Sequence, residues 1–258
     1  MPKAFLNGIN LYYEQHGSGL PIVLANGSSG TTRSWDPQIP ALSKRHRLIL
    51  YDLRGHGQTD SPRDISRYSM DIVVEDQYQL LRHLGVGQAV MAGISVGGMI
   101  AMHFYLKHPQ MTRALILINT GPGFRNPERR ARWREDRIRL AGIFEAGGME
   151  AFMASPFSKD SYYTTPEVMR SLDPVGQANF QRGVSADLPL IPVEQIRVPT
   201  LIILGENDAG QKPGSEYMSQ RIPGARLVVI PRSGHGVNVD EPELFNRAIL
   251  EFLKETGV

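Results

Sequence analysis

The sequence predicts an α/β fold, with helices on both faces of a mostly parallel sheet. Short apolar runs alternate with longer segments of helical periodicity along most of the 258 residues, which is the order that parallel strands joined by helices produce. The runs are continuously apolar, as is typical of strands buried on both faces. With 41% hydrophobic and 21% charged residues, the chain can bury one core, and α/β folds of about 250 residues often form a single domain.

The predicted elements follow one another in a regular order. The first is an antiparallel hairpin over residues 4–13, because Asn7-Gly8 in its middle supplies the positive φ of a tight turn. Six buried strands are expected at residues 22–25, 48–51, 89–92, 114–118, 201–204 and 227–230. Helices are expected at residues 35–42, 70–84, 97–107, 214–221 and 243–253.

The alternation of strand and helix stops in one long segment. Between Gly121 and Pro192 no strand-like run is present, and helical or irregular patterns fill the interval. We therefore expect an α/β core formed by residues 1–120 and 193–258, with residues 121–192 inserted as a helical cap.

Composition and patterning exclude several classes of protein. The formal net charge is only +2, so binding of nucleic acid by whole-molecule charge is not expected. The longest nearly apolar run, residues 89–102, is shorter than a membrane-spanning helix, and the first residues lack an apolar signal core, so we expect a cytoplasmic protein. With no cysteine, disulfides, thiolate metal sites and cysteine nucleophiles are excluded. No metal-ligand spacing or dinucleotide fingerprint is present, so no metal and no cofactor is expected.

The strongest chemical signal is the segment Gly93-Ile94-Ser95-Val96-Gly97-Gly98, which lies between a predicted strand and a predicted helix. A serine is a poor nucleophile unless it is exposed, oriented and next to a base, and a sharp strand-to-helix turn exposes it. The flanking glycines leave room for that turn. The first amide of the new helix, that of Val96, would stabilise a developing oxyanion.

A general base is expected in a loop at the carboxyl end of a strand, where open α/β sheets build their sites. His235 follows the strand at residues 227–230 and is our candidate. His56, in the glycine-rich segment Arg54-Gly55-His56-Gly57, is the one serious competitor.

The third group must be a carboxylate that orients the histidine. Asp208 follows the strand at residues 201–204, with Glu206 as a rival two residues earlier. The order Ser95, Asp208, His235 is the chain order of the α/β-hydrolase arrangement.

These motifs together resemble the α/β-hydrolase family along essentially the whole chain. Asn26-Gly27-Ser28 stands where the family usually has His-Gly and its oxyanion loop, so the resemblance implies that the backbone N–H of Ser28 is the second oxyanion donor. Asn26 replaces the common histidine, which puts the geometry of this loop in question. The stretch from Tyr51 to Thr59 resembles the family's Asp-x-Arg-Gly-x-Gly-x-Ser turn, with Thr59 in place of serine, and this match favours a structural His56.

The resemblance implies a serine hydrolase that cleaves a carboxylic ester or lactone, a small-molecule substrate, and the motifs are similar to those of 3-oxoadipate enol-lactonases and small carboxylesterases. A cofactor-free perhydrolase or haloperoxidase, or a C–C bond hydrolase, would use the same triad and stays an alternative, as does a non-catalytic binding module. An aspartate-dependent epoxide hydrolase or dehalogenase is disfavoured by Ser95.

Substrate choice is expected to depend on the cap. Trp133, Phe144, Met153 and Val237 are the candidate substrate-contacting side chains, and packing within the cap is the other interpretation for the cap residues. Seven arginines lie between Arg125 and Arg139. They are either a solvated helix face or a region that attracts anionic substrates.

Overall fold

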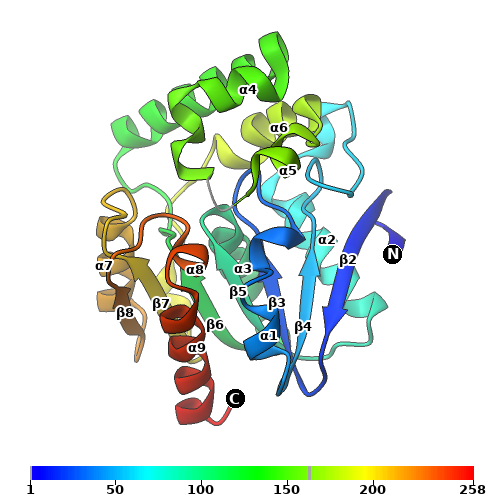
Figure 1. Ribbon diagram of the computed structural model, residues 1–258. Coiled ribbons are helices and arrows are strands. Elements are labelled where there is room, and N and C mark those ends of the chain that lie inside the picture. Colours follow the sequence, from blue (N-terminus) through cyan, green and yellow to red (C-terminus); the bar gives the residue numbers. More distant parts are fainter. Residues whose placement is uncertain (1, 162–163) are drawn as a thin grey trace.

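The computed structural model describes residues 2–161 and 164–258. Its centre is an eight-stranded sheet in the order β1-β2-β4-β3-β5-β6-β7-β8 (Figure 1). The strands are β1 (Lys3–Leu6), β2 (Ile9–His16), β3 (Leu20–Ala25), β4 (His46–Tyr51), β5 (Ala89–Ile94), β6 (Thr112–Ile118), β7 (Thr200–Gly205) and β8 (Arg226–Ile230). The strands from β4 to β8 in this order are parallel, whereas β1 and β2 are antiparallel to their neighbours. The mostly parallel sheet of an α/β fold, expected from the sequence, is confirmed.

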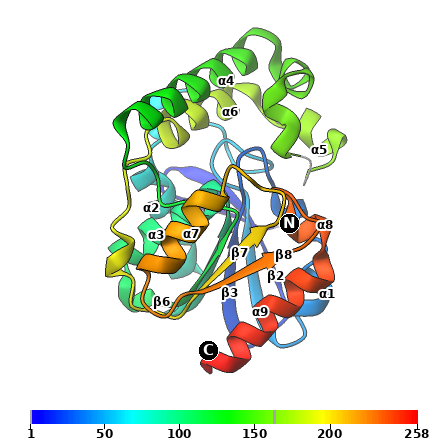
Figure 2. The same cartoon turned by 90° about the vertical axis from the view of Figure 1, so that its left-hand side faces the viewer.

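Helices cover both faces of the sheet (Figure 2). The α-helices of the described residues are α1 (Ile39–Leu42), α2 (Met70–His83), α3 (Val96–Lys107), α4 (Pro127–Ala154), α5 (Pro166–Arg170), α6 (Pro174–Phe180), α7 (Lys212–Arg221), α8 (Val237–Asp240) and α9 (Pro242–Thr256). Of these, α4, α5 and α6 lie in the segment between β6 and β7 rather than on a face of the sheet. One hydrophobic cluster joins α2, α3 and α7 to one face of the strands, and a second joins α1 and α9 to the other. Successive residues of each buried strand alternate between the two clusters, as for Val23 and Leu24. Both faces are therefore apolar, which explains the continuous apolar runs.

The expected helix over residues 35–42 is wrong in part. The chain forms a 3-10 turn, η1 (Thr32–Trp35), and then only the short α1. Pro37 and Pro40 lack the N–H group that a continuous helix needs, so the two turns stay separate.

The segment between β6 and β7 lies over the carboxyl edge of the sheet (Figure 1). We call residues 121–192 the cap segment; it contains α4, α5, α6 and a π-helical turn, η5 (Gln181–Ser185). It has a hydrophobic cluster of its own, in which Phe144 packs against Phe152 with ring centroids 4.8 Å apart. Among the described residues, no helix is long and apolar enough to cross a membrane.

Candidate active site

Ser95 lies on the sharp turn between β5 and α3. Its φ of 54° and ψ of −121° are strained for a residue with a side chain, and the side chain is only half-buried. A Cβ on Gly93 would overlap the backbone of Gly97, and a Cβ on Gly97 would overlap the backbone oxygens of Ala25 and Asn26. The two glycines therefore allow the strand, the helix and β3 to approach closely enough to form the turn.

Asp208 and His235 are brought together at the ends of β7 and β8, which are neighbouring strands. Nδ1 of His235 lies 2.6 Å from Oδ2 of Asp208, and each side chain is 10% exposed. A carboxylate in this position favours the tautomer with a proton on Nδ1, which leaves Nε2 able to accept a proton.

The two rival residues, Glu206 and His56, have different surroundings from Asp208 and His235. Glu206 is exposed and accepts a hydrogen bond from the backbone N–H of Arg232, not from His235. His56 is buried, its Nδ1 lies 3.2 Å from the carbonyl oxygen of Arg54, and its ring packs edge-on against Phe180. Burial lowers the pKa of His56 to about 4, so this imidazole is a neutral packed group.

Asn119, which sequence reasoning missed, connects the loops that carry the candidate residues. It follows β6 with a left-handed φ of 40° and is fully buried. Its Nδ2 donates to the carbonyl oxygens of Gly234 (2.9 Å) and His235 (2.8 Å), and its Oδ1 accepts from the N–H of Gly205 (2.8 Å). One amide therefore fixes the His235 loop relative to the end of β7.

Thr120, the next residue, extends this connection to Ser95. Its hydroxyl donates to the carbonyl oxygen of Ser95 at 2.7 Å. The backbone of Ser95 also donates to the carbonyl oxygen of Ile118 at 2.9 Å. The end of β6 thus positions both the serine turn and the histidine loop. The signal in the sequence was an asparagine directly after a buried strand, since asparagine tolerates left-handed angles.

Residues 26–31, which we call the β3 loop, carry the second expected oxyanion donor, Ser28. Both ends of the loop are held by the core. Nδ2 of Asn26 donates to the carbonyl oxygen of Tyr51 at 3.0 Å, and the N–H of Thr32, directly after the loop, donates to Oδ1 of Asp52 at 2.7 Å. Asn26 therefore anchors the start of the loop to the end of β4.

Asp52 is a buried carboxylate between the β3 loop and the turn after β4. It also accepts from the N–H of Gln58 at 2.8 Å. Burial raises the pKa of Asp52 to about 6, although the two N–H groups oppose this shift. The hydroxyl of Thr59 donates to the carbonyl oxygen of Asp52 at 2.7 Å, so threonine serves this turn as a hydrogen-bond donor.

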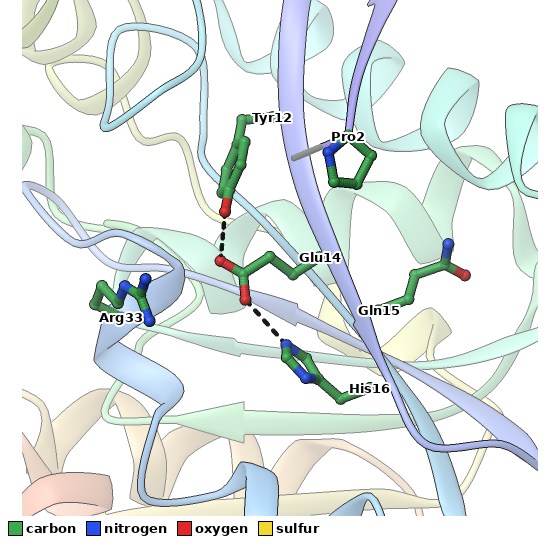
Figure 3. Close-up of a pocket in the computed structure, with 6 residues that line it drawn as sticks. All are labelled: Pro2, Tyr12, Glu14, Gln15, His16 and Arg33. Atoms are coloured by element: carbon green, nitrogen blue, oxygen red, sulfur yellow. Dashed lines mark hydrogen bonds and ion pairs between the residues drawn. The ribbon is translucent and has the colours of Figure 1, made fainter.

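A hollow of about 390 Å³ lies beside β2 and is lined in part by Tyr12, Glu14, His16 and Arg33 (Figure 3). The carboxylate of Glu14 accepts from the Tyr12 hydroxyl (2.6 Å) and the Thr32 hydroxyl (3.1 Å), and lies 2.9 Å from Nε2 of His16. Burial opposes ionisation of Glu14, but these hydrogen bonds hold its pKa below the usual value. Glu14 therefore supports η1 from the side of β2.

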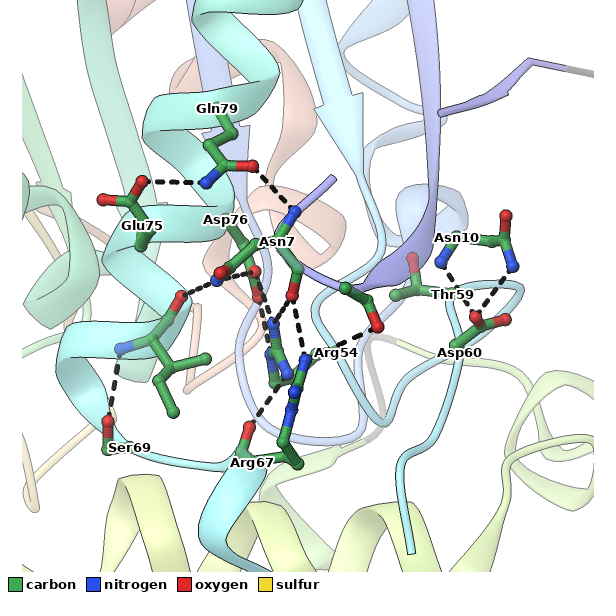
Figure 4. A network of polar contacts seen from close by, with 12 residues as sticks. Asn7, Asn10, Arg54, Thr59, Asp60, Arg67, Ser69, Glu75, Asp76 and Gln79 are labelled. Carbon is green, nitrogen blue, oxygen red and sulfur yellow. Dashed lines mark hydrogen bonds and ion pairs between the residues drawn. The ribbon is translucent and has the colours of Figure 1, made fainter. Parts of the chain in front are cut away.

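A buried ion pair fixes the turn after β4 to α2 (Figure 4). Nε and Nη2 of Arg54 lie 2.7 and 2.6 Å from the two carboxylate oxygens of Asp76, and both side chains are almost completely buried. Asn7 of the first hairpin donates to Asp76 at 2.8 Å, and Nη1 of Arg54 donates to the carbonyl oxygen of Arg67. Each charged group therefore has a hydrogen-bond partner besides the other, as a buried ion pair requires.

The candidate substrate-contacting residues are placed differently from one another. Trp133 is half-buried, donates from Nε1 to the carbonyl oxygen of Ser185 at 2.7 Å, and lies under the guanidinium of Arg137. Phe144 is buried in the cap cluster and Met153 packs against it, whereas Val237 is fully buried in the core beside α9. Contact with a substrate stays a prediction for all four.

The sheet, the strained serine turn and the Asp208–His235 pair define the class of protein. A family model described as the alpha/beta hydrolase fold matches residues 21–242. The chain belongs to this family.

Three relatives illustrate the similarity. The Bacillus subtilis protein named "Putative 2-succinyl-6-hydroxy-2,4-cyclohexadiene-1-carboxylate synthase" is 32% identical over 90% of this chain and 89% of its own. A thermophilic esterase from Thermogutta terrifontis has a TM-score of 0.85 at 29% identity, over 97% of this chain and 95% of its own. The enol-lactonase from Burkholderia xenovorans LB400 has the same TM-score at 28% identity, over 98% and 100%. These names describe different reactions, so the similarity extends to the scaffold and family rather than to one substrate.

Proposed function

We propose that the protein is a serine hydrolase that cleaves a carboxylic ester or lactone through an acyl-enzyme. The observation that carries the proposal is the 2.6 Å contact between Asp208 Oδ2 and His235 Nδ1, at the same edge of the sheet as the strained turn of Ser95. A nucleophile, a base and a group that orients the base are the three parts that this chemistry needs.

In the proposed acylation step, Oγ of Ser95 attacks the carbonyl carbon while Nε2 of His235 takes the hydroxyl proton. Asp208 stabilises the imidazolium that forms. The negative charge on the carbonyl oxygen is stabilised by the backbone N–H groups of Val96 and Ser28. The Val96 amide is the first of α3 and so has no acceptor within its helix, and the helix dipole adds to its effect.

The intermediate then collapses, the carbon–oxygen bond to the leaving group breaks, and His235 returns the proton to the departing alcohol. Water attacks the acyl-enzyme by the reverse sequence and releases the acid. For a lactone, alcohol and acid are one product molecule. An esterase and an enol-lactonase among the structural relatives are in keeping with this substrate class.

The test is a substrate panel with wild type and Ser95→Ala. We expect wild type to hydrolyse short-chain p-nitrophenyl esters or lactones. Ser95→Ala should lower the rate by several orders of magnitude, leaving only the residual catalysis by oxyanion binding, about 10³–10⁴ over water. Near-normal turnover by Ser95→Ala would exclude the mechanism. Perhydrolysis and cleavage of vinylogous ketones on the same panel separate the alternative chemistries.

A further inference from the structure

Gln177, a side chain of the cap segment, reaches the β3 loop. Gln177 lies on α6 and is fully buried. The hydroxyl of Ser29, in the middle of the loop, donates to Oε1 of Gln177 at 2.9 Å, across 148 positions of sequence. Nε2 of Gln177 donates to the carbonyl oxygen of Gly55, in the turn after β4, at 2.7 Å. Both ends of the amide are therefore used, one toward each loop.

The surroundings allow one orientation of this amide. A carbonyl oxygen can only accept, so the NH₂ group must face Gly55 and the oxygen must face Ser29. The backbone of α6 also touches the turn, because a Cβ on Gly55 would lie 2.8 Å from the carbonyl oxygen of Gly176. A Cβ on Gly176 would lie 2.9 Å from Cα of Gly55. The position of Gln177 relative to the turn is thus set by backbone contact.

Ser29 combines an uncommon backbone conformation with a buried hydroxyl group that requires a hydrogen-bond partner. Its φ of 60° is left-handed, which is uncommon for serine, and its side chain is buried. The ends of the β3 loop are held by core residues, through Asn26 and Thr32. At Ser29, the side-chain hydrogen bond comes from the cap instead. Ser29 directly follows Ser28, whose backbone N–H is the proposed oxyanion donor.

We propose that Gln177 is a positioning residue, through which the cap segment holds Ser29 and thereby aims the backbone N–H of Ser28 at the oxyanion. The inference rests on the proposed function, because it assigns Ser28 to the oxyanion hole. Its consequence is that the cap contributes to the rate of the chemical step and not only to the choice of substrate.

The experiment compares Gln177→Met, Ser29→Ala, the double variant and Asn179→Ala. Methionine keeps the length of the side chain and removes both hydrogen bonds. Asn179 is the matched control, because it lies on the same helix and donates to the carbonyl oxygens of Pro62 and Arg63, away from the β3 loop.

With p-nitrophenyl acetate, a substrate too small to depend on a specificity pocket, we expect Gln177→Met and Ser29→Ala each to lower kcat about tenfold, since full removal of one oxyanion donor costs about 10²–10³. KM should stay near the wild-type value. The double variant should be no worse than Gln177→Met alone, because both single changes remove the hydrogen bond between Ser29 and Gln177. Asn179→Ala should keep the wild-type kcat. A kcat of Gln177→Met equal to that of Asn179→Ala would overturn the inference, as would additive losses in the double variant.

Hydrogen exchange of the backbone amides of residues 28–30 gives a readout that does not need activity. Faster exchange in Gln177→Met than in Asn179→Ala is expected, and equal exchange would contradict the coupling. If wild type hydrolyses no ester or lactone, the proposed function fails, while the exchange result still decides whether Gln177 holds the loop.

Discussion

Asn119→Gly is the substitution from which we expect the most informative loss of stability and activity. Glycine accepts the left-handed φ of 40° without strain, so the change removes the side-chain hydrogen bonds and little else. The N–H of Gly205 and the carbonyl oxygens of Gly234 and His235 lose their partner. At about 1 kcal/mol for each of the three hydrogen bonds lost, the free energy of unfolding should fall by about 3 kcal/mol.

The effect on activity follows from the placement of His235. Without Asn119, the His235 loop is no longer tied to the end of β7, and a shift of about 1 Å in a reacting group can cost about 100-fold in rate. We expect kcat to fall about 10- to 100-fold with little change in KM, measured under conditions where circular dichroism shows the variant folded.

The control is Asn246→Ala on α9, where the lost hydrogen bond runs to the carbonyl oxygen of Pro37, remote from the candidate site. This variant should lose about 1 kcal/mol of stability and keep the wild-type kcat. If Asn119→Gly is destabilised to the expected extent but turns over like wild type, Asn119 has a structural role alone and the reasoning is refuted.

Three further outcomes are expected. Burial lowers the pKa of His56 from 6.5 to about 4, so its contribution to stability is present above pH 6.5 and is lost as the pH falls toward 4. Wild type should therefore lose about 2 kcal/mol more than His56→Gln between pH 7 and pH 5 in urea unfolding, and equal losses would contradict a buried neutral imidazole. Asp76→Asn leaves the guanidinium of Arg54 buried without its countercharge, and urea unfolding should show a loss of about 3–5 kcal/mol; a loss typical of surface pairs, below about 1 kcal/mol, would mean that water reaches the pair. Asp208→Asn should lower kcat about 10⁴-fold because the imidazole adopts the wrong tautomer, whereas Glu206→Gln should leave kcat near the wild-type value; the reverse order would assign the acid to Glu206.

The sheet could be predicted from the sequence because its strands are buried on both faces. In β5 and β7, for example, every residue is buried, so the strands appear as continuous apolar runs between helical segments. The region around Pro37 was predicted less well. Apolar periodicity indicated one helix there, but two prolines interrupt the backbone hydrogen bonding. The spacing of apolar residues gives no information about these missing N–H donors.

The candidate site was predictable where its chemistry requires a specific residue type. Ser95 could be found because its turn needs glycines on both sides, and His235 because it follows a strand at its carboxyl end. Asp208 was predicted as the acid with Glu206 as its rival, since both follow β7. The fold of the loop directs the carboxylate of Asp208 toward the imidazole.

The supporting contacts were not predictable. Asn119 and Gln177 act through side-chain amides whose partners lie 86 to 148 positions away. No local pattern encodes such pairings, because they depend on how the cap segment and the strand ends meet in space.

Covalent labelling tests the central claim, a Ser95 nucleophile activated by His235, most directly. Wild type, Ser95→Ala and His235→Ala would be treated with a fluorophosphonate, and the modified residue would be located by peptide mass spectrometry. We expect stoichiometric labelling of wild type on Ser95, none of Ser95→Ala, and much slower labelling of His235→Ala. Labelling of Ser95→Ala at the wild-type rate, or wild type that stays unmodified, would contradict the assignment of this serine.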